Sequence, residues 1–199
     1  MIHCSNLYYT EVQAEAAAKL KALSGMDKVF FANSGAEANE GAIKLARKYA
    51  TAKDPDKVQI ITALHSFHGR TLATLTATGQ EKYHQGFGPL PGGFDYVPFG
   101  NIDAIKAKIN DKTCAVMLEA IQGEGGVHVP DANYLKEVKA LCEQHDALLI
   151  IDEIQAGMGR TGKFFGYEHF GIQAGHRNTR KRPGRRGAYR RVFKYQKIS

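Results

Sequence analysis

Short apolar runs that alternate with amphipathic stretches constrain the fold of this 199-residue chain more than any other feature. The runs are rich in Val, Ile, Leu and Phe, and they predict strands at about 27–33, 57–64, 95–99, 113–119 and 147–152. Apolar spacing between the runs predicts helices at about 11–23, 35–51, 67–79, 101–109 and 131–145. This alternation is typical of an α/β fold, in which helices cover both faces of a mostly parallel sheet.

Local signals mark the ends of some of these elements. Thr10 and Gln13 have the spacing of a capping box at the start of the first helix, and Ser34 and Glu37 have it at the second. Residues 85–94 include two prolines and four glycines, which predict an ordered loop.

The charge of the chain changes abruptly after Gln173. Ten of the 27 Lys/Arg residues and none of the 20 Asp/Glu residues lie beyond it, so residues 1–173 are mildly acidic despite the formal net charge of +7. The stretch 174–199 has no apolar periodicity, and its composition predicts disorder. We therefore expect one globular unit, residues 1–173, and a basic tail, residues 174–199.

Cysteine content and hydropathy indicate a protein of the cytoplasm. Cys4, Cys114 and Cys142 are odd in number and widely spaced, which favours neither a disulfide framework nor a zinc site. The sequence contains no secretory signal and no apolar run of the roughly 20 residues that a membrane span needs, so we expect no membrane partner.

The first group of candidate site residues, 33–38, joins a predicted strand to a predicted helix. Ser34 caps this helix, Gly35 lets backbone N–H groups approach a ligand, and Ala36 follows. The partial positive charge of a helix N-terminus suits a phosphate. An ordinary helix cap is the alternative.

The second group, residues 65–71, follows the strand predicted at 57–64, where open α/β sheets bind ligands. Phe67 could stack on a planar ring, and the planar guanidinium of Arg70 could hold a carboxylate. His65 and His68 could equally be packed or surface histidines.

Acidic residues end two of the predicted strands. Asp152 follows a continuous apolar run, and burial of its carboxylate requires a cation such as a protonated pyridine nitrogen. Metal ligation by Asp152 and Glu153 is the alternative, but neighbouring strand residues point to opposite faces. Glu119 and Glu124, at the end of another strand, would lie near the same place.

Taken together, these groups resemble the class III pyridoxal-phosphate-dependent aminotransferases, and among them the acetylornithine type. The resemblance runs from about residue 3 to residue 173 and is strongest at 5–9, 31–47, 66–71, 118–126 and 151–162. It implies an incomplete three-layer αβα large domain of the fold-type I transferases. It also implies transfer of an amino group from N-acetylornithine to 2-oxoglutarate in arginine biosynthesis, by a homodimer.

The resemblance also implies the roles of individual residues. The cofactor, pyridoxal 5'-phosphate, would be bound by Ser34, Gly35, Ala36, Phe67, His68, Asp152 and Gln155. Arg70 and Glu124 would contact the amino-acid and 2-oxo-acid substrates. Ala120 stands where the family usually has proline.

Two departures from the family pattern accompany the resemblance. The N-terminal residues that usually precede this region are not recognisable, and neither is the sequence that usually follows it, including the Schiff-base lysine. One permitted set of codons for residues 174–191, read one base later, encodes the family's continuation, Pro-Asp-Ile-Val-Thr-Leu-Ala-Lys-Gly-Leu-Gly-Gly-Gly. The tail therefore looks like out-of-frame translation, Lys181 does not match the catalytic lysine, and we expect this fragment to be inactive.

Two alternatives remain open at this point. The chain could resemble another class III enzyme, acting on ornithine, succinylornithine or 4-aminobutyrate. It could also be a non-catalytic protein whose basic tail binds nucleic acid, although the tail offers few stacking aromatics and we do not expect this partner.

Overall fold

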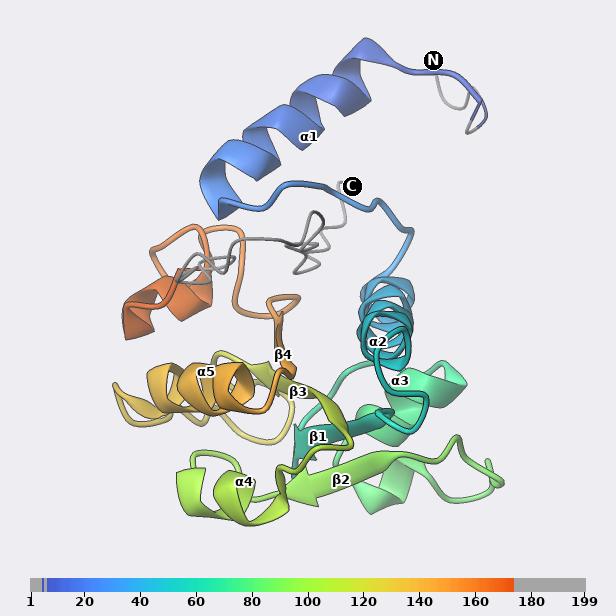
Figure 1. Cartoon of the computed structure of the whole chain (residues 1–199). Coiled ribbons are helices and arrows are strands. Elements are labelled where there is room, and N and C mark those ends of the chain that lie inside the picture. Colours follow the sequence, from blue (N-terminus) through green and yellow to red (C-terminus); the bar gives the residue numbers. More distant parts are fainter. Residues whose placement is uncertain (1–4, 6, 174–199) are drawn as a thin grey trace, which may run out of the picture.

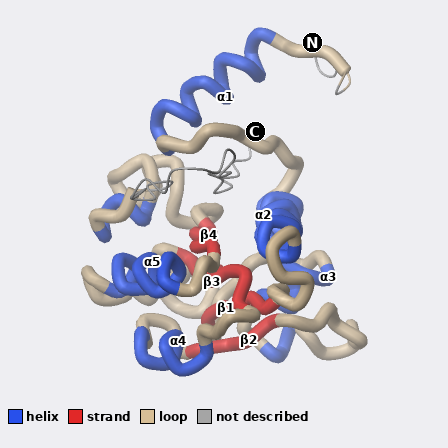
Figure 2. Tube along the Cα trace, in the orientation of Figure 1, coloured by secondary structure: helices blue, strands red, loops and turns tan. Residues whose placement is uncertain are grey.

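The computed structural model describes Ser5 and residues 7–173, and its centre is a four-stranded parallel sheet. The strands are β1 (Gln59–Ala63), β2 (Phe94–Val97), β3 (Thr113–Glu119) and β4 (Leu148–Asp152), in the spatial order β2-β1-β3-β4. Every pair in the sheet is parallel, so the carboxyl ends of all four strands lie at one edge (Figures 1 and 2). Parallel neighbours need crossover connections, and helices occupy these connections.

Four of the five α-helices in the described residues cover the two faces of this sheet. The α-helices are α1 (Glu11–Ser24), α2 (Gly35–Thr51), α3 (Leu72–Ala77), α4 (Ile102–Lys108) and α5 (Tyr134–Gln144), and the 3₁₀ helices are η1 (Glu81–Tyr83) and η2 (Gly166–Phe170). Figure 1 shows α2 and α3 on one side of the strands and α4 and α5 on the other. The described part of the chain thus has the three-layer αβα architecture that the sequence predicted.

Two hydrophobic clusters divide the core along the sheet. Every residue of β3 is buried, and successive side chains point to opposite faces. Met117 lies in the cluster beneath α2, with Ile43 and Ile60. Val116 lies in the cluster beneath α4 and α5, with Leu135. Burial on both faces explains why β3 reads as a continuous apolar run rather than an alternating one.

Most predicted elements are confirmed, with ends that differ by a few residues. The helix predicted at 35–51 has the bounds of α2, and the strand predicted at 113–119 has those of β3. The loop predicted at 85–94 leads into β2 without helix or strand before Phe94.

Three predictions about local structure were wrong. Residues 27–33 form no strand, because they lie outside the sheet and have no neighbouring strand with which to hydrogen-bond. The helix predicted at 67–79 shortens to α3, since Gly69 has a φ of +135°, which a helix cannot contain. Thr10 has the backbone conformation of an N-cap, but its side chain accepts no capping hydrogen bond, so the first capping box does not form.

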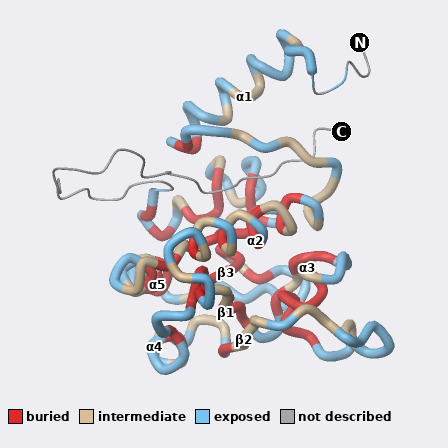
Figure 3. The backbone as a smooth tube through the Cα atoms, turned by 45° about the vertical axis from the view of Figure 1, so that its right-hand side comes forward, coloured by how far each residue is buried: buried red, intermediate tan, exposed pale blue. Residues whose placement is uncertain are grey.

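The N-terminal segment stands apart from the sheet. Most of α1 is exposed (Figure 3). Ser24 is its only buried residue, and Leu7, Tyr9 and Val12 are highly exposed. Within the described residues, no helix is long and apolar enough to pass through a bilayer. The tail 174–199, for which the sequence predicts disorder, lies outside the described residues.

Candidate functional site

Four candidate segments meet at the carboxyl ends of the parallel strands. Asp152 ends β4, Glu119 ends β3, and residues 65–71 follow β1. The N-terminus of α2 joins them, because Gly35 packs against the side chain of Ile154, two residues beyond Asp152. A Cβ atom added at Gly35 would lie 3.0 Å from Ile154 Cγ1, so glycine allows this close approach.

Asp152 is the centre of a buried polar network, and only 6% of its surface is exposed. Its Oδ2 atom accepts hydrogen bonds from Asn39 Nδ2 at 2.7 Å and from His68 Nδ1 at 2.8 Å. Its Oδ1 atom accepts from the backbone N–H of Ile154 at 3.0 Å. One buried carboxylate thus receives three hydrogen bonds, from two side chains and one backbone N–H group.

Asn39 is a site residue that the sequence analysis missed. It lies on the buried face of α2, among small apolar residues such as Ala38 and Ala42. Its Nδ2 atom bonds both Asp152 and the backbone carbonyl oxygen of His68, the latter at 2.8 Å. An amide on an otherwise apolar helix face was the available signal, because buried polar groups need partners.

Glu119 lies beside this network. It is the register partner of Asp152 on the neighbouring strand and is 3% exposed. Its Oε2 atom accepts from the backbone N–H of Phe67 at 3.3 Å. Burial raises the pKa of Glu119 to about 7, the charge of Asp152 adds to this effect, and His68 opposes it.

The turn at 33–36 has a modified form of the expected cap. Ser34 Oγ accepts from the backbone N–H of Glu37 at 3.2 Å, as the capping box requires. The Glu37 carboxylate accepts from the N–H of Asn33 at 2.6 Å rather than from that of Ser34. Ala36 packs against Gly69, whose added Cβ would lie 2.8 Å from Ala36 Cβ, so this turn is held against the segment after β1.

The rings of Phe67 and Tyr83, the latter in η1, pack against each other, and the guanidinium of Arg70 lies near both. The Phe67 and Tyr83 rings meet edge to face, with centroids 5.7 Å apart. Arg70 Cζ lies 6.0 Å from the Phe67 centroid and 5.9 Å from that of Tyr83. The Arg70 side chain is exposed and thus available to an anion, while Tyr83 is a neighbour that sequence spacing did not reveal.

Gln155 and Glu124 face each other across two loops. Gln155 Nε2 donates to Glu124 Oε1 at 3.4 Å, and both residues are exposed. The structure therefore brings together Gln155, a candidate cofactor ligand, and Glu124, a candidate substrate ligand, which are 31 positions apart in sequence.

Asp152 and Glu153 have separate surroundings. Glu153 accepts from the backbone N–H groups of Gly166 and Tyr167, at 2.7 and 2.9 Å, and so holds the start of η2. Among the described residues, no group of three or more His, Cys, Asp or Glu side chains could hold a metal ion. This arrangement disfavours metal ligation by the Asp152 and Glu153 pair.

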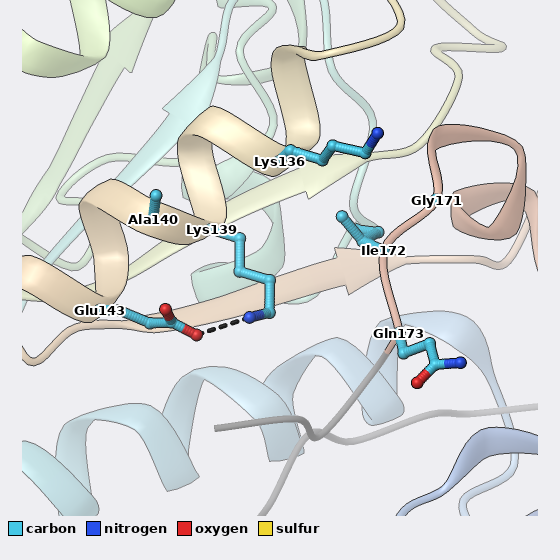
Figure 4. Close-up of a pocket in the computed structure, with 7 residues that line it drawn as sticks. All are labelled: Lys136, Lys139, Ala140, Glu143, Gly171, Ile172 and Gln173. Atoms are coloured by element: carbon cyan, nitrogen blue, oxygen red, sulfur yellow. Dashed lines mark hydrogen bonds and ion pairs between the residues drawn. The ribbon is translucent and has the colours of Figure 1, made fainter. Parts of the chain in front are cut away.

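A hollow of about 500 Å³ lies outside this site, between α5 and the end of the described chain (Figure 4). Its polar groups include Lys139 and Glu143, which pair with each other. None of the candidate site residues lines it: its lining residues are Lys136, Lys139, Ala140, Glu143, Gly171, Ile172 and Gln173. We assign it no part in the chemistry.

Comparison with known proteins gives consistent results. The family described as "Aminotransferase class-III" matches residues 1–175. The acetylornithine aminotransferase of Caldanaerobacter subterraneus subsp. tengcongensis is 60% identical over 173 residues, and that of Methanocaldococcus jannaschii is 56% identical over 174. These matches cover 86% and 87% of this chain but only 44% of each relative, so the chain spans less than half of their length.

Solved structures match the fold as well. The ornithine aminotransferase of Toxoplasma gondii has a TM-score of 0.80 and 34% identity, covering 85% of this chain and 41% of that one. The N-acetylornithine aminotransferase of Stenotrophomonas maltophilia has a TM-score of 0.71 and 42% identity, covering 86% and 42%. The chain therefore belongs to the class III aminotransferases, with a sheet of the fold-type I kind.

Proposed function

We propose that this chain is part of a pyridoxal-phosphate-dependent aminotransferase of the acetylornithine type. The observation that carries this proposal is the buried Asp152 carboxylate at the carboxyl end of β4, held by three hydrogen bonds beside a helix N-terminus. One structure of the Toxoplasma ornithine aminotransferase is described as having partial occupancy of pyridoxal phosphate at its active site.

The residues fit this cofactor on structural grounds. Each carboxylate oxygen can accept two hydrogen bonds, so Asp152 Oδ1, which accepts one from Ile154, can accept another from a protonated pyridine nitrogen. Gly35 and Ala36 in the first turn of α2 suit a phosphate, because that turn has unpaired backbone N–H groups and a partial positive charge. Ser34 would stabilise this turn.

The remaining candidates would orient the ring and the substrate. Phe67 would stack on the ring, His68 would hold Asp152 in place, and Gln155 would contact the ring hydroxyl. When bound, pyridoxal phosphate supplies an electron sink for bond cleavage next to the amino group. Asp152 serves that chemistry by holding a proton at the pyridine nitrogen.

Arg70 and Glu124 would contact the substrates. The exposed guanidinium of Arg70 can bind a carboxylate of the amino acid or the 2-oxo acid. Glu124, which accepts a hydrogen bond from Gln155, would help the site to accept first an amino acid and then a 2-oxo acid. We infer N-acetylornithine as the amino donor and 2-oxoglutarate as the acceptor, because acetylornithine aminotransferases share 56–60% of their matched residues with this chain.

We also infer a cytoplasmic homodimer in the intact protein, with neither nucleic acid nor membrane as a partner.

We propose that this 199-residue chain binds the cofactor but does not transaminate. No described lysine hydrogen-bonds Asp152, His68 or Glu119, and the family's catalytic lysine is not recognisable. Loss of such a general base costs roughly 100-fold to 10,000-fold in rate. Residues 1–173 would then be a partial cofactor-binding domain, and residues 174–199 an out-of-frame tail.

The test is an absorbance titration of the full chain with pyridoxal phosphate. We expect saturable binding that Asp152→Asn weakens at least tenfold, because the amide keeps the shape and removes the charge. Asp103→Asn, at an exposed position on α4, is the matched control and should bind as the wild type does. Equal affinity of D152N and wild type would overturn the proposed cofactor position.

The choice of substrate requires a second experiment. Sequencing the gene across the Gln173 codon shows whether a frame continues with the family's lysine. The product of that restored frame should form glutamate from N-acetylornithine and 2-oxoglutarate faster than from ornithine, succinylornithine or 4-aminobutyrate. Preference for one of those donors would favour the other class III enzymes. Glutamate formation by the 199-residue chain itself would show that it is active.

A further inference from the structure

Two buried polar atoms near the proposed cofactor position have no hydrogen-bond partner within the described chain. They are His68 Nε2 and Glu119 Oε1, and each belongs to a residue whose other polar atom is bonded. Buried polar atoms of this kind are uncommon in folded proteins and require an explanation. The proposed function gives no role to Glu119.

The two neighbouring carboxylates have very different surroundings. Asp152 and Glu119 are register partners on adjacent strands, which run about 4.8 Å apart. Asp152 receives three donors, from Asn39, His68 and Ile154, whereas Glu119 receives a long bond from Phe67 N and lies near the N–H of Gly123. When two buried carboxylates lie side by side, the one with fewer donors keeps its proton.

We propose that Glu119 is a positioning residue that carries a proton beside Asp152, so that Asp152 is the ionised member of the pair and faces the cofactor alone. The same carboxyl group anchors the backbone of Phe67, the proposed ring-stacking residue. Its importance for the cofactor rests on the proposed function. The proton on Glu119 does not, because it follows from burial and hydrogen bonding in the free chain.

The unpartnered atoms agree with this assignment. His68 uses its Nδ1 atom for the hydrogen bond to Asp152, which leaves Nε2 as its unpartnered atom. A proton on Glu119 makes its Oε1 atom a potential donor and avoids a second buried anion beside Asp152. Two titratable side chains act on Glu119, namely His68 from the segment after β1 and Asp152 from β4, while α2 contributes the neutral amide of Asn39.

The first measurement follows the proton directly. In the full chain labelled with ¹³C at glutamate carboxyls, the Glu119 resonance is the one that Glu119→Gln removes. We expect its midpoint near neutral pH, where burial places the pKa at about 7, and we expect the ¹⁵N shift of His68 to change with the same midpoint. In E119Q the His68 step at that midpoint should disappear. Glu143→Gln, on the exposed end of α5, is the control and should retain it.

A midpoint for Glu119 in the ordinary glutamate range, or an unchanged His68 step in E119Q, would overturn the proposal. Where E119Q does not fold, a through-bond correlation from the backbone amide of Glu119 to its carboxyl carbon assigns the resonance, and the wild-type titration then decides the question. A second titration with saturating pyridoxal phosphate separates this inference from the proposed function. A protonated pyridine nitrogen at Asp152 should lower the Glu119 midpoint by half a unit or more, because a nearby cation favours the carboxylate. A neutral-range midpoint that pyridoxal phosphate does not move would support the proton on Glu119 and contradict the cofactor position.

Discussion

At the residue scale, three acidic side chains at the ends of β3 and β4 illustrate how surroundings decide chemistry. Asp152 has three donors, Glu119 has a long bond from Phe67, and Glu153 accepts two backbone N–H groups of η2. All three are buried, so the charge on each depends on its partners rather than on solvent. The sequence alone identified these acidic residues, but it did not show that their hydrogen-bond partners differ.

Glu119 should make stability depend on pH. Burial raises its pKa from 4.5 to about 7, so between these values the folded chain holds a proton that the unfolded chain releases. Stability therefore falls as pH rises through this window, by at most about 3 kcal/mol for one group. We expect the melting temperature of Glu119→Gln, relative to wild type, to rise between about pH 5 and pH 8. Differential scanning fluorimetry measures it, and a constant difference would argue against the elevated pKa.

Gly69 should be intolerant of any side chain. An added Cβ would lie 2.6 Å from Thr74 Oγ1, and the φ of +135° is itself strained for other residues. We expect Gly69→Ala to lower the free energy of unfolding by more than about 2 kcal/mol in urea denaturation. Gly86→Ala is the control, because Gly86 has a φ of +84° but open space around it. Equal costs would mean that the backbone, not the contact, dominates.

At the element scale, α3 is too short to be stable without external anchors. Glu40 of α2 supplies one, because its Oε1 atom accepts from Thr71 Oγ1 at 2.6 Å and from the N–H groups of Ala73 and Thr74 at 3.1 and 3.2 Å. We expect Glu40→Ala to cost about 1–3 kcal/mol and to speed amide exchange in α3. Glu40→Gln keeps the acceptor and should recover most of the loss. Equal loss in both variants would assign the effect to charge alone.

The elements also indicate what sequence reasoning can reach. In α2, buried residues recur from Ala38 to Ala50 and Ser34 caps the start, so local sequence predicts this helix well. The short helix α3 also depends on long-range contacts with Glu40, which no local pattern encodes. The strand expected at 27–33 had an apolar run but no partner, because strands, unlike helices, require a neighbour. The candidate site residues were found because they end apolar runs, and Asn39 and Tyr83 were missed because their contacts are long-range.

At the scale of the whole molecule, α1 differs from the rest of the described chain. Only Ser24 of this 14-residue helix is buried, and isolated helices of this length are marginal in water. We expect amides of α1 to exchange at least 100-fold faster than those of β3 in hydrogen–deuterium exchange, because β3 is buried throughout. Comparable protection of the two segments would indicate that α1 is covered in solution.

The first turns of α2 also fix the spacing between the helix cap at Ser34 and the amide of Asn39. Ser34 caps the helix and Asn39 holds Asp152, and five residues of α-helix advance about 7.5 Å along its axis. The helix start and the carboxylate are therefore held in a fixed relation by one rigid element, so a molecule that touches both must match their separation as well as their charge. One residue inserted between Gly35 and Asn39 would turn the amide by about 100° away from Asp152. We therefore expect the spacing within this helix to tolerate insertion less well than any substitution on its exposed side.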